Sequence, residues 1–167
     1  MQIFEPTTAE QLQDTASLMR EFLQWTHIRF ADMPEVVAGY YDMEAWNREL
    51  DNLSAEYQRP DGGLLLAIAE HAAIGCVALR RFDDEICEMK RLFVSPNGHR
   101  RGTGRALCMA LFEMGRELGY SHMRLETGDL QTEAQTLYRK LGFAEIPPYR
   151  THPEFLLDHM VCMERAL

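Results

Sequence analysis

Three apolar segments lie close together in the middle of the chain, and they constrain its fold more than any other feature. They are residues 64–70, 74–81 and 86–94, linked only by His71-Ala72-Ala73 and by a turn at Phe82-Asp83-Asp84. Apolar runs of this length, bounded by short turns, predict strands. Strands with such short links pair antiparallel, because a parallel pair needs a long crossover. The sequence therefore predicts an antiparallel meander.

Segments with helical periodicity lie on both sides of these strands. Before them, a short strand is predicted at 3–5, apolar residues recur at helical spacing from Leu12 to Leu23, and a second helix is predicted at 43–57. The elements predicted after the meander are a helix that opens at Gly102-Thr103-Gly104 and ends at Gly119, a strand at 123–127, a helix at 132–141 and a strand at 160–164. This order predicts a mixed α/β sheet rather than a doubly wound one, in a single domain over residues 1–167.

The charge balance argues against one class of partner. The chain carries 17 Lys and Arg against 26 Asp and Glu, a formal net charge of −9 over 167 residues. Sequence-independent binding of nucleic acid needs a basic surface, so we expect no nucleic-acid partner. The acidic excess favours solubility and, among small molecules, a cationic substrate.

The sequence shows no targeting or metal-binding signal. The N-terminus has no early Lys or Arg and no apolar signal-peptide core, and the longest apolar run, Leu64 to Ala69, is too short to cross a bilayer. The four cysteines form no C-x-x-C pair, and the six histidines show no H-E-x-x-H spacing. We therefore expect a cytoplasmic protein with free thiols, no membrane contact and no metal site.

The segment from Glu88 to Leu107 (EMKRLFVSPNGHRRGTGRAL) carries the most informative chemistry. An apolar strand ends at Val94, Pro96 stops ladder pairing, and a helix begins at Gly102 and Gly104. A helix N-terminus presents unpaired N–H groups and the positive end of the helix dipole, and glycine lets a ligand approach the backbone. The basic residues around this point are His99, Arg100, Arg101 and Arg105. In a chain of net negative charge, this cluster indicates a phosphate site.

Two better-known phosphate motifs do not fit this segment. A P-loop needs Lys followed by Ser or Thr after its second glycine, and here Arg105-Ala106 follow Gly104. A dinucleotide fingerprint needs a third glycine, where this chain has Leu107, and a parallel βαβ unit, where antiparallel strands are predicted. The remaining alternative is a solvated surface turn with a helix cap.

The same segment resembles motif A of the GNAT superfamily of N-acetyltransferases: a strand with an acidic residue, then V-x-P, then R/Q-x-x-G-x-G/A opening a helix. The matching residues are Val94, Pro96, Gly102, Gly104, Ala106 and Leu107. His99 stands where the family usually has Arg or Gln. The stretch from Ala134 to Phe143 is similar to motif B, A-x-x-L-Y-x-x-x-G-F, with Gln131 at the position of a common Asn. By this resemblance, the chain is identified as a member of the superfamily.

The resemblance implies a fold and a cofactor. The fold is that of acyl-CoA N-acyltransferases: a central, mostly antiparallel sheet, splayed after a β-bulge and flanked by about four helices. The cofactor is acetyl-CoA, the acyl donor, and its pyrophosphate is held by main-chain N–H groups of the loop. The residues that the resemblance assigns to it are Leu92, Phe93, Val94, Arg100, Arg101, Gly102, Thr103, Gly104 and Arg105. The Leu92 N–H would hold the thioester carbonyl oxygen, as a donor placed where negative charge develops.

Two residues are candidates for acid–base chemistry. An alkylammonium of pKa about 10 must lose a proton before it attacks a thioester, and Glu88 matches the acidic residue that several relatives use as a base. The alternatives for Glu88 are attraction of a cationic acceptor or ion pairing with Arg80, Arg81 or Lys90. Tyr138 matches the tyrosine that often protonates the leaving CoA thiolate, and its alternative role is that of an aromatic core residue.

The sequence names no single acceptor. Aromatic rings and a carboxylate suit an amine, and the candidate residues are Trp25, Tyr40, Tyr41, Glu126 and Tyr149. The expected reaction is direct transfer of an acetyl group from acetyl-CoA to a primary amine, of a small molecule or a peptide, in a ternary complex. Two alternatives remain open: a non-catalytic CoA-binding sensor or partner-binding module on the same fold, and a phosphate-binding nucleotide module. A homodimer is compatible with the sequence, which sets no oligomeric state.

Overall fold

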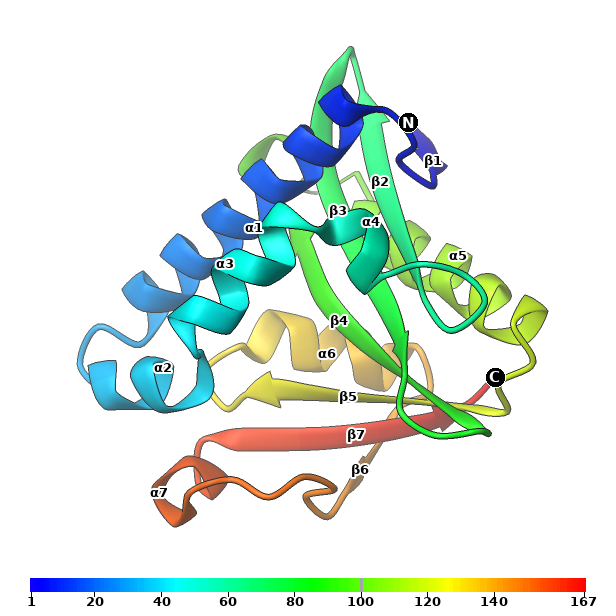
Figure 1. Ribbon diagram of the computed structural model, residues 1–167. Helices are drawn as coiled ribbons and strands as arrows, with labels where there is room; N and C mark the ends of the chain where they lie inside the picture. Colours follow the sequence, from blue (N-terminus) through cyan, green and yellow to red (C-terminus); the bar gives the residue numbers. More distant parts are fainter. Residues whose placement is uncertain (100) are drawn as a thin grey trace.

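The three apolar segments in the middle of the chain form the centre of a seven-stranded sheet in the computed structural model, which describes residues 1–99 and 101–167 (Figure 1). They are β2 (Gly63–Ala69), β3 (Ala72–Arg81) and β4 (Ile86–Val94), and they pair antiparallel in sequence order. β1 (Gln2–Phe4) extends this meander by pairing antiparallel with β2. The predicted meander is therefore confirmed.

The second part of the sheet joins the first through a parallel strand. β5 (His122–Gly128) runs parallel to β4, because α5 lies between them in the chain and provides the crossover that a parallel pair needs. β7 (Met160–Ala166) then inserts between β5 and β6 (Ala144–Ile146), antiparallel to both. The resulting strand order is β1-β2-β3-β4-β5-β7-β6, the mixed sheet that the sequence predicts.

Helices cover both faces of the sheet (Figure 1). The helices on one face are α1 (Ala9–Arg29), α2 (Pro34–Tyr40), α3 (Met43–Asp51) and α4 (Leu53–Glu56). The other face is covered by α5 (Thr103–Glu117) and α6 (Thr132–Lys140), and α7 (Glu154–Leu157) precedes β7 near α2.

The described residues contain seven α-helices, several of them short, against an expected number of about four. Helix α1 and helices α5 and α6 are long enough to show the periodicity of 3.6 residues, whereas α2, α4 and α7 have between four and seven residues. The helix predicted at 43–57 is divided, because Asn52 adopts φ −139° and ψ 40° between α3 and α4.

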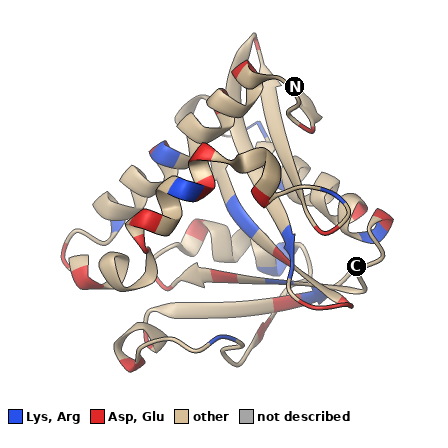
Figure 2. Cartoon of the chain, viewed as in Figure 1, with Lys and Arg blue, Asp and Glu red and all other residues tan. Residues whose placement is uncertain are grey.

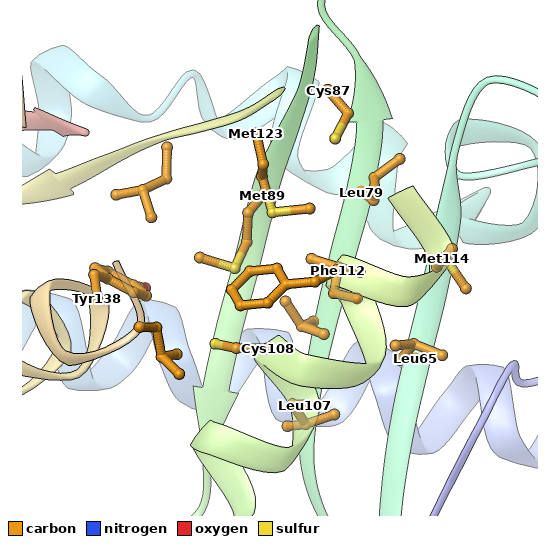
Figure 3. Close-up of a cluster of buried hydrophobic side chains, with 14 of the residues drawn as sticks. Leu65, Leu79, Cys87, Met89, Leu107, Cys108, Phe112, Met114, Met123 and Tyr138 are labelled. Carbon is orange, nitrogen blue, oxygen red and sulfur yellow. The ribbon is translucent and has the colours of Figure 1, made fainter. Parts of the chain in front are cut away.

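Side chains alternate across the sheet and fill two separate cores. Alternate strand residues such as Leu79, Cys87 and Met89 pack under α5 and α6 in one core (Figure 3). Their neighbours point to the opposite face, where Ala78 belongs to the core beneath helices α1–α4. By the same alternation, three charged residues of β3 and β4 face that helical layer: Arg80, Glu88 and Lys90.

The cysteines are free thiols inside these cores. All four are buried and unpaired, as the absence of C-x-x-C spacing predicts: Cys76, Cys87, Cys108 and Cys162. Burial raises the pKa of the Cys108 thiol to about 12, so the thiol stays protonated and unreactive. Separately, none of the helices in the described part of the chain is long and apolar enough to cross a membrane.

Candidate active site

A cleft opens in the sheet where β4 and β5 separate. The two parallel strands pair at their N-terminal ends, and their register stops at Glu88 opposite Arg124. β4 also carries a β-bulge against β3: Lys90 faces Ala78 and Phe93 faces Cys76, so two residues of β4 stand opposite one of β3. The first of these two, Arg91, has a positive φ of 58°. The splay after a bulge, which the resemblance implies, is present.

The separated strands form the walls of a cavity of about 530 Å³, together with α1, α2 and α6. This size is within the range of sites for small molecules and cofactors. The predicted site residues that line it are Trp25, Tyr40, Tyr41, Leu92, Phe93, Val94, Gly104, Glu126 and Tyr138. Chain segments that are more than 100 residues apart therefore meet at one cavity, as the sequence predicts.

The loop after β4 leaves the N-terminus of α5 open. Gly102 is the N-cap residue at φ +72°, and a Cβ built on it would meet nothing within 4 Å. Within the described residues no side chain caps this helix. The Thr103 hydroxyl donates instead to the carbonyl of Gly98, at 3.0 Å. The N–H groups of the first turn are therefore available to an anion, and a pyrophosphate group fits this arrangement.

The basic residues of the same loop have different surroundings. Arg101 donates from Nη1 to Oε1 of Glu70 at 2.8 Å, and Arg105 is exposed. The Nε2 atom of His99 lies 3.0 Å from the carbonyl oxygen of Val94. Arg100, a predicted cofactor residue, lies outside the described residues. The side chains of Arg101 and Arg105 thus lie on the surface beside the helix N-terminus.

Tyr138 combines both roles predicted for it. It belongs to the core under α5 and α6 (Figure 3). Its ring centroid lies 5.7 Å from that of Phe143. It also lines the cavity. Burial raises the pKa of its hydroxyl far above the ordinary value. The phenol is therefore protonated at neutral pH and can act as a proton donor.

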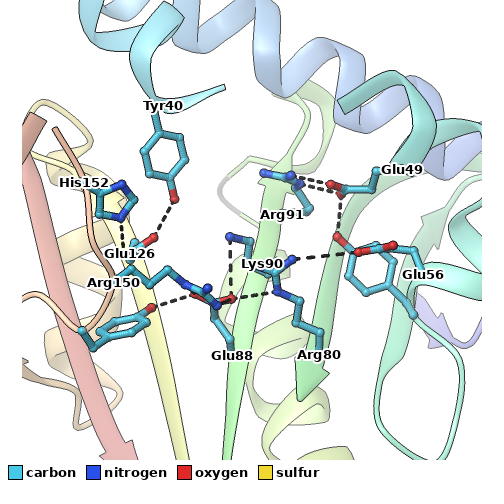
Figure 4. Close-up of polar contacts among 12 residues, drawn as sticks. Tyr40, Glu49, Glu56, Arg80, Glu88, Lys90, Arg91, Glu126, Arg150 and His152 are labelled. Carbon is cyan, nitrogen blue, oxygen red and sulfur yellow. Dashed lines mark hydrogen bonds and ion pairs between the residues drawn. The ribbon is translucent and has the colours of Figure 1, made fainter. Parts of the chain in front are cut away.

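Glu88 is the centre of a buried ion-pair network (Figure 4). Its side chain is 0% exposed, and it accepts hydrogen bonds from Arg80 Nε at 2.9 Å and from Arg150 Nη2 at 2.8 Å. The Tyr149 hydroxyl donates to it at 2.9 Å, and Lys90 Nζ lies 3.8 Å away. Burial alone raises the pKa of Glu88, but the nearby cations outweigh burial and lower it to about 2.

These contacts favour the ion-pairing role of Glu88 over the role of a base. Its carboxylate has no exposed surface, does not line the cavity and stays ionised at any working pH. Of the partners considered from the sequence, Arg80 and Lys90 are present, whereas Arg81 pairs with Asp61 and Asp84. The side chain of Tyr149 is likewise directed to Glu88 and not to the cavity.

A second carboxylate, Glu126, occupies the cavity wall. Its Oε2 atom accepts a hydrogen bond from the Tyr40 hydroxyl at 3.1 Å, and its Oε1 atom lies 2.9 Å from His152 Nε2. The rings of Tyr40 and His152 stack with centroids 5.9 Å apart. The structure therefore brings together two of the predicted acceptor residues and adds a histidine to them (Figure 4).

A second cavity, of about 580 Å³, adjoins the first one. The residues that line both are Tyr40, Tyr41, Lys90, Arg91 and Glu126. Arg91 fixes this shared wall, since it donates to both carboxylate oxygens of Glu49 at 2.7 and 2.6 Å and lies 4.3 Å over the Trp46 ring. The bidentate pair ties α3 to the bulge of β4.

Sequence reasoning missed Arg150 and His152 as site residues. Both lie in the stretch from Pro147 to Pro153, which predicts only a break in secondary structure. The available signal for these site residues was a run of polar residues between prolines, because prolines restrict the backbone of a loop and thereby fix the side chains that it carries. Among the described residues, no group of three or more His, Cys, Asp or Glu side chains is arranged to hold a metal ion.

Comparison with known proteins identifies the family to which this arrangement belongs. The family model for the acetyltransferase (GNAT) family matches residues 19–143, which is more than half of the chain. The chain belongs to the GNAT family. The matched region contains the bulge of β4, the open N-terminus of α5 and the Tyr138 helix, and thus most of the residues that line the cavity.

Curated GNAT relatives cover part of the chain. An uncharacterised N-acetyltransferase of Schizosaccharomyces pombe is 39% identical over 107 residues, covering 63% of this chain and 66% of that protein. The IAA acetyltransferase of Azospirillum brasilense is 37% identical over 93 residues, covering 54% of this chain and 60% of that protein. Human N-acetyltransferase 8 is 30% identical over 110 residues, covering 62% of this chain and 48% of that protein. The chain thus spans about half to two thirds of the length of these relatives.

Solved GNAT structures match the whole chain. An acetyltransferase from Streptococcus agalactiae has a TM-score of 0.74 at 20% identity and covers 99% of this chain and 98% of its own. The PaiA N-acetyltransferase from Thermoplasma acidophilum, solved in complex with coenzyme A, has a TM-score of 0.71 at 21% identity and covers 100% of both chains. These matches confirm the expected acyl-CoA N-acyltransferase fold.

Proposed function

We propose that this GNAT protein transfers the acetyl group of acetyl-CoA to a primary amine, by direct attack of the amine on the thioester in a ternary complex. The observation that carries the proposal is the cleft between β4 and β5. It places the bulge of β4, the uncapped N-terminus of α5 and the Tyr138 side chain around one cavity. The acceptor is the amine of a small molecule or of a peptide.

The chain offers each part of acetyl-CoA a suitable group. The N–H groups from Gly102 to Arg105 would hold the pyrophosphate at the positive end of α5. Leu92, Phe93 and Val94 line the cavity, and their backbone would pair with the pantetheine arm. The Leu92 N–H would donate to the thioester oxygen as negative charge develops there. The bound coenzyme A in the T. acidophilum structure supports this assignment.

Proton transfer in this proposal uses Glu126 and Tyr138. A base must lie within reach of the proton that it removes, and Glu126 lines both cavities whereas Glu88 lines neither. The Glu126 carboxylate would bind the ammonium form of the acceptor and take its proton, directly or through water. The Tyr138 phenol, whose pKa is raised by burial, keeps its proton until the thiolate leaves.

The cytoplasm remains the predicted location. Four buried, unpaired thiols agree with a reducing compartment. No nucleic-acid or membrane partner is part of the proposal, and a homodimer stays a prediction.

The proposal is tested by following free CoA thiol when the purified protein is given acetyl-CoA and a panel of primary amines. We expect amine-dependent release of thiol and an acetylated amine of matching mass. Tyr138→Phe should lower kcat by about tenfold or more, because the proton donor is lost. The matched control is Tyr120→Phe. Tyr120 is also a buried tyrosine, but its hydroxyl donates to the Asp61 carbonyl, so this variant should keep the kcat of the unmodified protein.

Two outcomes would contradict the proposal. Tight binding of acetyl-CoA with no acetylation of any amine would favour the non-catalytic sensor. A rise in melting temperature with ATP but not with CoA would favour the nucleotide module.

A further inference from the structure

The face of the sheet beneath helices α1–α4 carries a group of cationic side chains at its centre. Three of them surround the buried carboxylate of Glu88, and we call Arg80, Lys90 and Arg150 the cation cluster (Figure 4). Figure 2 shows Lys and Arg on the central strands β3 and β4, inside a chain whose net charge is −9. Within hydrogen-bond distance the cluster has one carboxylate partner among the described residues, Glu88, and Glu56 pairs with Arg80 from farther away, at 4.0 Å.

The cation cluster keeps hydrogen-bond donors free for a ligand. An arginine has five N–H donors; Arg150 uses Nε and Nη2 on Glu88, and Arg80 uses Nε. Both side chains are 32% exposed, and Lys90 is 12% exposed. All three line the second cavity. Burial lowers the pKa of Lys90 to about 8 despite the nearby Glu88, and a second anion at this point would favour its charged form.

The acidic residues on the wall of the same cavity have other partners. Asp42 accepts from the backbone N–H groups of Glu44 and Ala45 and caps α3. Glu49 is held by Arg91, and Glu126 by Tyr40 and His152. Glu56 is 4.0 Å from Arg80 Nη1, farther than a hydrogen bond. Of these wall carboxylates, Glu56 pairs with Arg80 at ion-pair distance, whereas none pairs with Arg150 or Lys90 within 4.0 Å.

Aromatic rings hold Arg150 of the cluster in place before any ligand arrives. The guanidinium carbon of Arg150 lies 5.2 Å from the centre of the Phe82 ring and 5.9 Å from that of Tyr149. Tyr149 itself is fixed by its hydrogen bond to Glu88. A guanidinium group presents its donors in one plane, which matches the two oxygens of a carboxylate. A preorganised pair of arginines is suited to a planar anion.

We propose that the acceptor is an amine that also carries a carboxylate, and that the cation cluster binds this carboxylate. This inference rests on the proposed function. The second cavity holds the acceptor, and its carboxylate lies at Arg80 and Arg150. The wall shared by the two cavities contains Lys90 and Glu126, so the amine end lies beside Glu126 and faces the first cavity. Amino acids and related zwitterions have this chemistry. The simple cation favoured by the acidic composition lacks the anionic group that the cluster fits.

The test compares pairs of acceptors that differ only in the carboxylate. With saturating acetyl-CoA, kcat/KM is measured for three pairs. Phenylalanine is paired with its amide and, separately, with 2-phenylethylamine, and lysine is paired with 1,5-diaminopentane. We expect the carboxylated member of each pair to be better by about tenfold or more, since hydrogen bonds between charged groups are the strong ones. Equal or higher values for the amide or for the decarboxylated amines would overturn the proposal.

Two arginine variants locate the effect. Arg150→Gln should raise KM for the carboxylated acceptor by about tenfold and remove its advantage over the decarboxylated amine. The matched control is Arg124→Gln: Arg124 also lies over the Phe82 and Tyr149 rings, but it pairs with Glu164 and not with Glu88. Arg124→Gln should leave unchanged both the KM for the carboxylated acceptor and the advantage of that acceptor over the decarboxylated amine. Calorimetry with acetyl-CoA shows that each variant is folded. If both variants lose the preference for the carboxylated acceptor equally, the assignment of Arg150 to the carboxylate is contradicted.

Failure of the proposed function can be told apart from failure of this inference. If no amine is acetylated, 3-phenylpropionate is titrated into the protein as a carboxylate probe without an amine. Binding that is lost in Arg150→Gln and kept in Arg124→Gln would support the cation cluster as a carboxylate site. The absence of binding to the unmodified protein would overturn it.

Discussion

At the scale of single residues, two carboxylates of the same sheet face have opposite environments. Glu88 accepts a hydrogen bond from a tyrosine hydroxyl and is enclosed by three cations, which outweigh burial and hold its pKa at about 2. Glu126 lies on the wall of both cavities and contacts a hydroxyl and a histidine. In the proposed reaction, access to the acceptor, more than charge, separates their roles: Glu88 would position cations, and Glu126 would take the proton.

Matched substitutions of the two carboxylates test this division. Glu126→Gln should lower kcat by about 100-fold, the usual range for loss of a general base, and change the pH dependence of kcat/KM. Glu88→Gln should raise the acceptor KM and leave that pH dependence unchanged, because a group with a pKa of about 2 does not titrate near neutral pH.

The opposite pattern would restore Glu88 as the base. A pH profile that shifts in Glu88→Gln and stays fixed in Glu126→Gln would contradict the account. Affinity for acetyl-CoA, measured on both variants, separates a catalytic defect from a folding defect.

Part of this residue-scale arrangement could be predicted from the sequence. The pairing of Glu88 with Arg80 follows from an antiparallel register across a short turn, where neighbours in the sheet are close in the sequence. Arg150 reaches the same carboxylate from 62 positions away, through a loop without periodicity. The local sequence pattern does not predict a contact between residues so far apart, so the cation cluster could be identified only from the structure.

At the scale of elements, the N-terminus of α5 is the feature proposed to bind the pyrophosphate of acetyl-CoA. Its first-turn N–H groups are uncapped among the described residues, and Gly102 provides both the positive φ and the open space above them. The sequence predicted this element well, because two glycines and a long amphipathic helix are strong local signals. It did not predict α2, β6 and α7, which are too short to show a period, and it joined α3 and α4 in one helix.

Two glycine variants separate ligand binding from backbone strain. Gly102 and Gly119 both have positive φ, at +72° and +90°, and a Cβ on either would meet nothing within 4 Å. Alanine at each position should reduce stability by about 1 kcal/mol through strain. Only Gly102→Ala should weaken acetyl-CoA binding, by about tenfold, because its methyl group occupies the approach of the pyrophosphate. Equal affinities of the two variants for acetyl-CoA would exclude this loop as the phosphate site.

At the scale of the whole molecule, the site exists because one sheet changes its mode of pairing. The antiparallel meander ends at β4, β5 follows it in parallel, and the two strands pair over only three positions before they separate. The resemblance of motifs A and B predicted this splay. The second cavity has no sequence signal, because its walls come from α2, α3, three strands and the loop before α7.

The most direct test of the account is titration calorimetry of acetyl-CoA into the purified chain. We expect one saturable site with a Kd of about 10 μM or tighter, and ATP, which lacks the pantetheine arm, should bind far more weakly. No heat of binding with acetyl-CoA, or equal affinity for ATP, would contradict the claim that the cleft between β4 and β5 is built for a CoA thioester.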